Sequence, residues 1–274
     1  MTTIPPKKLV PEEGRRSASQ TREFAKEQWT AFVAALQFLT IVPPLVRRLF
    51  SNAELGSSVT YFPVVGLLLG FMLAIVNVLL RRLLPIEVAT VLTLSVWVLL
   101  TGALHMDGFL DSCDGLWGGR TPDERLSIMR DHRVGAYAAI GGILLILLKF
   151  AVIARLQQPA AAIVIACVTG RWLICWAIIL FPYGRTQGLG RVIKDFAFRQ
   201  HGVWATVIAL VAVIVISPFW GLTAFGFATL VGLLIARFSL KRLPGLTGDI
   251  YGAVCELGEA TVLVVWSACE KGAL

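Results

Sequence analysis

Charged residues are scarce in this sequence. Only 15% of the 274 residues are charged and 57% are hydrophobic, whereas a typical soluble domain carries about 25% charge. A soluble fold of this size buries at most about 75% of the surface of its unfolded chain, which is too little to hide so many apolar side chains. The composition therefore excludes an ordinary soluble enzyme and a disordered chain, and it indicates a polytopic membrane protein.

Cysteine patterns and targeting signals are missing too. The five cysteines include no C-x-x-C pair, which argues against a structural zinc site and a disulfide framework. Residues 1–28 are too polar for the apolar region of a signal peptide and too rich in glutamate for a transit peptide. We therefore expect the protein to be inserted into the membrane by its own helices.

Long apolar segments fill most of the remaining sequence. The backbone in lipid must satisfy its hydrogen bonds internally, so these segments predict helices. They are Val59–Leu80, Ile86–Leu104, Ala136–Ala154, Pro159–Phe181, Gly202–Ile216, Phe219–Ala236 and Tyr251–Ala268. The sequence thus predicts an all-α, polytopic membrane bundle with about six to seven transmembrane helices.

The N-terminal part is predicted to lie outside this set of helices. Residues 1–28 are predicted to form a polar cytoplasmic tail with a helix from Thr21. Residues 29–274 are predicted to form one membrane-embedded catalytic domain. Trp29–Val46 is apolar, but Pro43-Pro44 interrupts it after 14 residues, which is short of the roughly 20 needed to span. We therefore expect Trp29–Val46 to form an interfacial or re-entrant helix.

The basic residues predict the orientation. If Trp29–Val46 does not cross, 19 of the 25 Lys and Arg residues fall on the side of the tail and three on the opposite side; if it crosses, the split is only 13 to nine. Because Lys and Arg accumulate in cytoplasmic loops, the tail side is predicted to be cytoplasmic. The same rule explains the net charge of +8 without a nucleic-acid partner.

Acidic residues cluster after the second apolar segment. Six of the 17 acids lie within residues 105–135, where Asp107, Asp111 and Asp114 are spaced to share one helical face. Like charges on one face repel, so the three carboxylates favour a shared cation, and Mg²⁺ prefers such oxygen ligands. The alternative is a solvated acidic loop. His105 is a further candidate ligand, or it hydrogen-bonds a neighbour.

Basic residues follow the acidic run. Thr121 and Pro122 are typical of a helix start, and Asp123 and Glu124 are interpreted as capping residues of that helix. Phosphate groups would suit the basic residues near it, although a basic helix end at the membrane surface is the alternative. These candidates for phosphate binding are Arg120, Arg130 and Arg133, with Asp131 as a fourth carboxylate beside them.

A second acidic cluster begins the last apolar segment. Asp249 and Glu256 share a helical face, and Glu259 lies close to it. Acids in an apolar helix are costly and mark functional sites, here either a substrate or metal site or a proton or ion pathway. Arg171, within an apolar segment, requires a partner. Arg185 belongs to a basic loop where phosphate contact and simple positive-inside bias are both plausible.

Several of these runs together resemble the cobalamin synthase family (adenosylcobinamide-GDP ribazoletransferases). The most specific is GALHMDGFLDSCDGLWGGR from Gly102, continued by ERLSIMRDHRVGAY from Glu124. LQFLTIVP, YFPVVGLLLG and GLTGDIYGA are similar to other family elements in the same order, and the likeness covers roughly residues 30–265. Pro244 and His132 depart from the family pattern, but neither departure removes a carboxylate.

The resemblance implies an Mg²⁺-dependent transferase of a late step of cobalamin biosynthesis in the bacterial inner membrane, with its active site facing the cytoplasm. It implies adenosylcobinamide-GDP and α-ribazole, or α-ribazole 5′-phosphate, as substrates and GMP as a product. It leaves open a homo-oligomer or association with other late enzymes of the pathway. The expected metal ligands are Asp107, Asp111 and Asp114. The expected catalytic residues are these three with Asp131 and Asp249, either of which would accept the hydroxyl proton. The expected substrate- and phosphate-binding residues are Arg120, Arg130, Arg133, Arg185, Glu256 and Glu259.

Two other functions are considered. The D-x-x-D-G run also resembles CDP-alcohol phosphotransferases, with one residue more before the arginine, which would imply a phospholipid product. A secondary transporter would use Glu256, Glu259 and Arg171 as an ion relay. Transporters often contain repeated halves, and the acidic motif is not repeated in the second half of this sequence.

Overall fold

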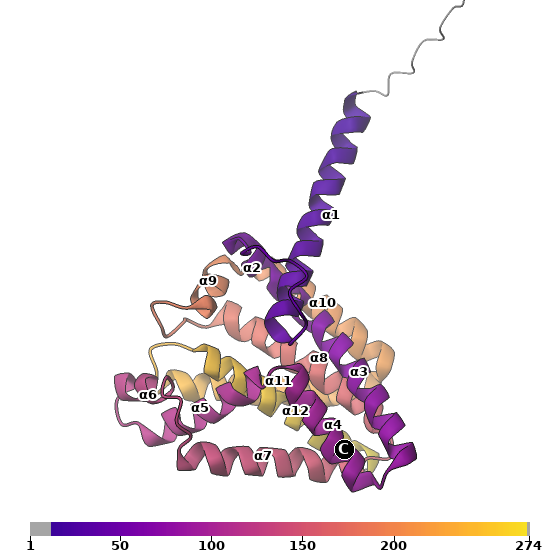
Figure 1. The fold of residues 1–274 in the computed structure, drawn as a ribbon, viewed down its shortest axis with the longest axis vertical. Helices are drawn as coiled ribbons and strands as arrows, with labels where there is room; N and C mark the ends of the chain where they lie inside the picture. Colours follow the sequence, from indigo (N-terminus) through magenta and orange to yellow (C-terminus); the bar gives the residue numbers. More distant parts are fainter. Residues whose placement is uncertain (1–11, 273–274) are drawn as a thin grey trace, which may run out of the picture.

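The computed structural model describes residues 12–272, with side chains described from residue 23 onward; the first eleven residues of the predicted tail lie outside the described part. The described residues form helices and no β-strand, which confirms the all-α prediction (Figure 1). The helices are α1 (Glu12–Leu39), α2 (Asn52–Ser58), the 3-10 turn η1 (Val59–Tyr61), α3 (Phe62–Leu83), α4 (Ile86–Leu100), α5 (Leu104–Gly118), α6 (Pro122–Ile128), α7 (Ala136–Arg155), α8 (Pro159–Leu180), α9 (Leu189–Phe196), α10 (Arg199–Ile216), α11 (Pro218–Leu240) and α12 (Gly248–Glu270).

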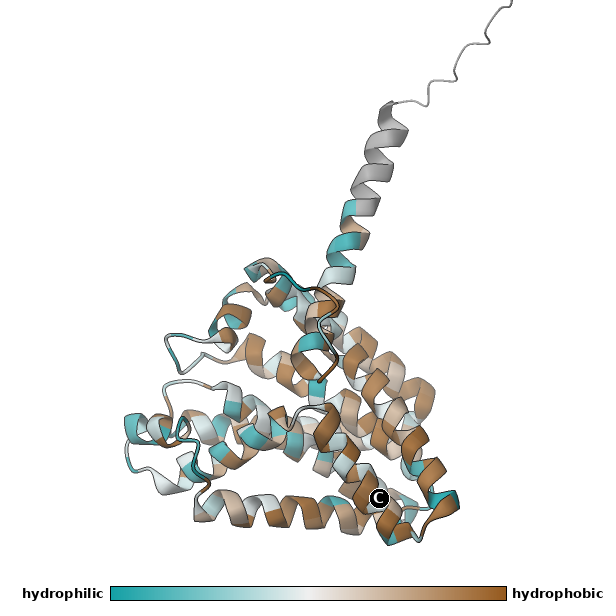
Figure 2. Cartoon of the chain, in the orientation of Figure 1, coloured by the Kyte–Doolittle hydropathy of each residue, from teal (hydrophilic) through white to brown (hydrophobic). Residues whose placement is uncertain are grey.

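Six helical segments within the described residues are long and apolar enough to cross a membrane, and their outer surfaces are largely hydrophobic (Figure 2). They are α2 to α3 taken together, α7, α8, α10, α11 and α12. The predicted span Ile86–Leu104 is not one straight helix: α4 ends at Leu100, and the chain turns by 89° into α5. Counting this bent pair as one crossing gives seven, so the predicted number of six to seven holds.

Helix α8 is the centre of the bundle. Most of its side chains are buried, and it packs against α3, α10, α11 and α12. Gly66 and Gly70 of α3 allow the closest approach, because a Cβ atom at either position would lie within 2.7 Å of α8 backbone atoms at Cys167 or Val164. Small residues four apart are a common way for helices to pack closely in a membrane.

Helix α1 differs from its prediction. We expected a helix from Thr21 and a separate one over Trp29–Val46, whereas one helix runs from Glu12 to Leu39 without a break. It ends before Pro43-Pro44 and does not qualify as a membrane span. Its C-terminal part packs on the bundle, where the Tyr61 hydroxyl donates to Gln28 Oε1 at 2.7 Å.

The loops collect at two opposite ends of the bundle. At one end the loops before α9 and α12 meet, with Gly184 N donating to Leu246 O at 2.7 Å. At the other end Arg81 donates to the carbonyl oxygens of Ile153 and Leu156, and Glu270 accepts from Gln157 N. Figure 1 shows α5, α6 and α9 far from the C-terminus. The predicted grouping of the loops is therefore present in the structure.

Candidate active site

A sharp corner between α4 and α5 positions the acidic motif. Gly102 and Ala103 both adopt φ of +58°, a left-handed conformation that is unfavourable for alanine. Ala103 is the single non-glycine residue with positive φ among residues 12–272. The corner sets α5 at 89° to α4 and lays it against α7 and α12, with Asp114 beside the start of α7.

The carboxylates of α5 line a cleft of about 330 Å³. Asp107, Asp111 and Asp114 all contribute to it, as their spacing predicts. Partial burial, followed by the negative charges of Asp107 and Asp249, raises the pKa of Asp111 to about 7. Within the described residues, however, no three acid, histidine or cysteine side chains lie close enough together to hold a metal ion by themselves.

Asp114 differs from the other two acids of α5 in its partners. Its Oδ2 accepts a hydrogen bond from Gly135 N at 2.6 Å, and its Oδ1 accepts one from Ala138 N at 2.9 Å. These amides belong to the first turn of α7 and have no partner within the helix. Asp114 therefore caps α7 from a neighbouring helix, an arrangement that its position on α5 does not reveal.

Arg185 and Asp249 connect two distant segments at the cleft. Arg185 lines the cleft, and its guanidinium donates to Asp249 Oδ2 at 2.6 Å. Both side chains are largely buried, with 17% and 16% exposed. Thr247, which our sequence analysis missed, also donates to Asp249 Oδ2 at 3.0 Å and caps α12. Its place directly before G-D was the available signal, since threonine is a preferred N-cap.

The α6 region supplies the other rim of the cleft. Thr121 caps α6 as predicted, and Arg130, Asp131 and Arg133 line the cleft behind it. Asp131 forms an exposed ion pair with Arg133 at 2.6 Å, and hydrogen bonds from Arg133 lower the pKa of Asp131 to about 2. Arg120 is exposed and does not line the cleft.

Glu256 and Glu259 lie away from the cleft, in a buried network. Lys149 of α7, another residue that our sequence analysis left unassigned, donates to both glutamates at 2.6 Å. Arg171 pairs with Glu259 and donates to His105 Nδ1 at 3.4 Å. Arg171 therefore has the partner that it requires, and His105 hydrogen-bonds a neighbour. The two glutamates face these basic side chains and not a substrate cleft.

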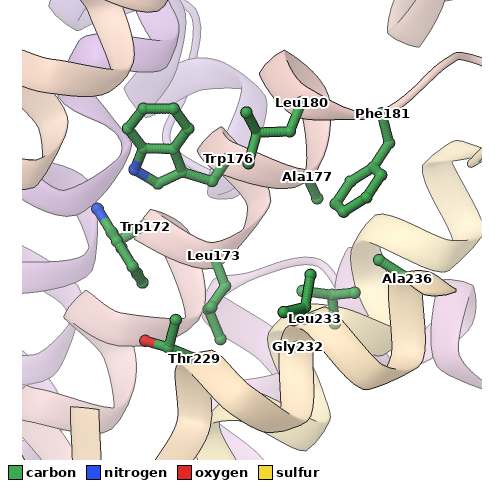
Figure 3. Close-up of a pocket in the computed structure, with 11 residues that line it drawn as sticks. Trp172, Leu173, Trp176, Ala177, Leu180, Phe181, Thr229, Gly232, Leu233 and Ala236 are labelled. Atoms are coloured by element: carbon green, nitrogen blue, oxygen red, sulfur yellow. The ribbon is translucent and has the colours of Figure 1, made fainter. Parts of the chain in front are cut away.

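A separate apolar hollow of about 360 Å³ lies between α8 and α11. Figure 3 shows Trp172, Trp176 and Phe181 around it, with Leu233 opposite. It has no acidic or basic side chain in its wall. This hollow therefore offers no charged group that could bind a phosphate or a metal ion.

Fold and site together define a polytopic helical membrane protein with an acidic, arginine-rimmed cleft at one end of the bundle. A family model described as cobalamin-5-phosphate synthase matches residues 31–267. The chain belongs to this family. The Arg185–Asp249 pair and the α5 carboxylates fall within the matched region.

Three curated relatives share the same name. Proteins called adenosylcobinamide-GDP ribazoletransferase are 37% identical in Pseudomonas fluorescens, over 85% of this chain and 97% of the relative, and 38% identical in Desulforamulus reducens, over 84% and 92%. A third, from Roseiflexus, is 34% identical over 90% of this chain and 94% of its own length. No solved structure matches the chain. The predicted family and enzyme class, a transferase of cobalamin synthesis, are thus confirmed.

Proposed function

We propose that this protein transfers the cobinamide-phosphate moiety of adenosylcobinamide-GDP to the 5′-hydroxyl of α-ribazole or its 5′-phosphate. The 5′-oxygen attacks the phosphorus on the cobinamide side of the pyrophosphate. The bond from that phosphorus to the bridging oxygen breaks, GMP leaves with its phosphate, and the hydroxyl proton passes to a carboxylate. The products are adenosylcobalamin, or its 5′-phosphate, and GMP.

The observation that carries this proposal is the pairing of acids and bases in one cleft. Asp107 and Asp111 lie on one wall, and Arg130, Arg133 and Arg185 lie around it. Phosphoryl transfer depends mainly on positioning and on neutralising phosphate charge. A cleft with both carboxylates and guanidinium groups supports binding of a pyrophosphate with a divalent cation.

The donor set fits Mg²⁺. Asp107 and Asp111 would hold it, since Mg²⁺ is commonly bound through one or two carboxylates together with substrate phosphates and waters. This requirement agrees with a cleft that lacks a complete protein cage. When bound, the ion would neutralise pyrophosphate charge. Asp114 is less suited, because both of its oxygens already accept hydrogen bonds from α7.

The arginines of the cleft are expected to have two roles: contact with the phosphates and positioning of Asp249. Arg130 and Arg133 on the open rim would contact the phosphates, where guanidinium groups form strong hydrogen bonds. Arg185, more buried, also holds Asp249. The exposed Arg120 lies outside the cleft, and Glu256 and Glu259 are paired with Lys149 and Arg171. None of the three is expected to contact substrate.

Asp249 is the better candidate for the proton acceptor. A general base works best when its pKa lies near the working pH, and the low pKa of Asp131 makes that carboxylate a weak base. Asp249 is largely buried and lies next to the α5 carboxylates. Replacing Asp249 with Asn is therefore expected to reduce kcat far more than replacing Asp131 with Asn.

The proposal is tested by incubating membranes that contain the protein with adenosylcobinamide-GDP and α-ribazole. GMP release together with a corrinoid product is expected with Mg²⁺, and EDTA should stop both until Mg²⁺ is restored. Turnover that persists in EDTA would overturn the metal assignment. A phospholipid product from a CDP-alcohol would favour the phosphotransferase alternative, and solute uptake without GMP release would favour a transporter.

A further inference from the structure

Another apolar hollow lies on the side of α5 that faces away from the acidic cleft. Its volume is about 410 Å³, and its wall is formed by α5, α11 and α12. Phe109 and Leu116 contribute from α5. At roughly 100° per residue, they lie about half a turn from Asp107, Asp111 and Asp114. The group that fills this hollow therefore supports the helix that carries the cleft carboxylates.

The hollow opens on the membrane-facing side of the bundle. Leu234 of α11 and Trp117 of α5 line it and are 56% and 57% exposed. Helix α11 is one of the candidate membrane spans and ends at Leu240. Leu234 lies about 9 Å before that end along the helix axis. The hollow is therefore at the depth of the first methylene groups of a phospholipid, next to the head groups.

Basic side chains lie at the rim of the hollow. The guanidinium of Arg242 lies over the ring of Phe238, with Cζ 3.6 Å from the ring centroid, and Phe238 is part of the wall. Lys241 is exposed and follows Leu234 by seven residues and Phe238 by three, so it shares their face of α11. The Arg125 guanidinium donates to the carbonyl oxygen of Arg242 at 3.4 Å and brings a third positive charge.

These three charges are not neutralised by acidic side chains. None of Arg125, Lys241 and Arg242 forms an ion pair with a carboxylate among residues 23–272. The preference of basic residues for the cytoplasmic side explains their sign, but it does not explain their position around an apolar hollow. Cations above an apolar surface at the membrane boundary match a ligand with an anionic head and a hydrocarbon chain.

We propose that this site binds one anionic phospholipid, with an acyl chain in the hollow and the phosphate against Lys241 and Arg242. The binding goes beyond the proposed function and does not depend on it. The consequence for catalysis rests on the proposed function: the lipid holds α5 in place from behind, so turnover depends on the lipid composition of the membrane.

Other occupants fit the site less well. A second copy of this chain, in a two-fold interface centred on the hollow, would bring the same cations together, and like charges repel. A corrinoid carries several amide groups around its ring, whereas the wall is mostly apolar and the Ser112 hydroxyl already donates to Gly108 O at 2.7 Å. A soluble phosphate compound would use the basic rim and leave the hollow empty.

The first experiment tests the head group by mass spectrometry of the intact, purified protein released from a nonionic detergent. Phosphatidylglycerol and phosphatidylcholine with the same acyl chains are added in turn. We expect the wild type to retain one phosphatidylglycerol about tenfold or more tightly than phosphatidylcholine. The variant Lys241→Gln/Arg242→Gln should bind phosphatidylglycerol about 30-fold more weakly and lose the preference, because each basic residue near an anionic lipid contributes roughly fivefold.

The matched control removes two charges outside the site. Arg47→Gln/Arg199→Gln changes two exposed basic residues on the same predicted side of the membrane and should keep the preference of the wild type. No preference in the wild type, or an unchanged preference in Lys241→Gln/Arg242→Gln, would overturn the proposal.

The second experiment fills the hollow. Leu234→Trp adds bulk at an exposed position of its wall and should weaken phosphatidylglycerol binding about tenfold, since a filled site must be pushed open. Leu230→Trp, one turn earlier on α11, is 52% exposed and outside the wall, so it should bind as the wild type does. Equal Kd values for the two variants would overturn the placement of the chain.

The same measurements recognise the other occupants. Competition by glycerol 3-phosphate at the concentration of the lipid would assign the basic rim to a soluble anion. A dimer that Leu234→Trp converts to a monomer, with lipid binding unchanged, would assign the hollow to a second copy. Either result would overturn the proposal.

Vesicles test the consequence for catalysis. GMP release from adenosylcobinamide-GDP with α-ribazole should be about fivefold faster in mixed phosphatidylglycerol and phosphatidylcholine vesicles than in phosphatidylcholine alone. Lys241→Gln/Arg242→Gln should match the wild type in phosphatidylcholine and show no gain. Equal rates of the wild type in both vesicles would overturn the support of α5 by the lipid. If the wild type releases no GMP in either vesicle, the proposed function is wrong, whereas lipid binding measured by mass spectrometry stands.

Discussion

At the residue scale, three aspartates with one spacing have different environments. Asp107 and Asp111 face the cleft with like charges nearby, whereas Asp114 accepts hydrogen bonds from the first turn of α7. Sequence spacing places all three on one face of α5. It does not indicate that the start of another helix will occupy one of them, because that depends on where α7 packs.

Asp111 is expected to be essential for turnover. Asp111→Asn keeps the shape of the side chain and removes its charge, so GMP release should fall at least about 100-fold while the melting temperature in detergent stays the same or rises. The rise would follow because a neutral amide avoids the burial of a charge and the repulsion from Asp107 and Asp249, which together raise the pKa of Asp111. Asp123→Asn, an exposed change in the first turn of α6, should remain within about twofold of wild type. Wild-type turnover by Asp111→Asn would contradict the assignment of this residue.

Replacing Asp114 is expected to lower the stability of the fold more directly than it lowers turnover. Asp114→Ala leaves the amides of Gly135 and Ala138 without their acceptors, and loss of a helix cap typically costs about 1–2 kcal/mol. The melting temperature in detergent should therefore fall by several degrees, and less in Asp114→Asn, which keeps one acceptor oxygen. Lost turnover at an unchanged melting temperature would instead favour a ligand role.

At the element scale, the corner between α4 and α5 is the feature that could not be predicted from the sequence. Hydropathy correctly predicts the existence and the approximate bounds of the other membrane helices. It merges Ile86–Leu104 into one span, because Thr101, Gly102 and Ala103 are all acceptable in a membrane helix. Tertiary contacts decide the turn; for example, Ile41 N donates to Leu100 O at 2.9 Å, and this contact is remote in sequence. Helix α1 differs from its prediction for another reason: the composition changes from polar to apolar near Trp29, but no proline or glycine interrupts residues 15–39, so the helix continues across that change.

The crossing of α5 and α12 gives an element-scale prediction. A Cβ atom on Gly252 would lie 2.6 Å from the carbonyl oxygen of His105, whereas one on Gly248 would meet nothing within 4 Å. Gly252→Ala must therefore push the two helices apart and separate Asp107 from Asp249. We expect Gly252→Ala to lower kcat at least about tenfold, since small displacements of positioned groups are costly. Gly248→Ala, in the first turn of the same helix, should keep wild-type kcat; equal kcat values for both variants would contradict the role of the close crossing.

At the scale of the whole molecule, charge is sparse but organised. The buried charges balance one another, since Lys149 and Arg171 face Glu256 and Glu259 and link α7, α8 and α12. Unpaired charges would be very costly in such an interior. The sequence identified two of these acids as unusual but could not name Lys149 as their partner, because residues 107 and 110 positions apart meet only in the folded bundle. The remaining charges lie mainly at the end that contains the cleft.

This asymmetry predicts which way the molecule lies in the membrane. The loops around the cleft, the segment 47–58 and the N-terminal tail contain 19 of the 25 basic residues, and the loops before α9 and α12 meet in the structure. Because short basic loops are retained in the cytoplasm, a reporter enzyme fused after Ser127, at the cleft end, should read cytoplasmic. One fused after Leu84, between α3 and α4, should read periplasmic, since Arg81 at the end of α3 contacts the start of the α7–α8 loop at the opposite end. Changing Arg81 and Arg82 to Gln should leave both readings the same, because the few basic residues at that end do not set the orientation. A periplasmic signal after Ser127 would place the cleft on the periplasmic side and contradict the orientation that the basic residues predict.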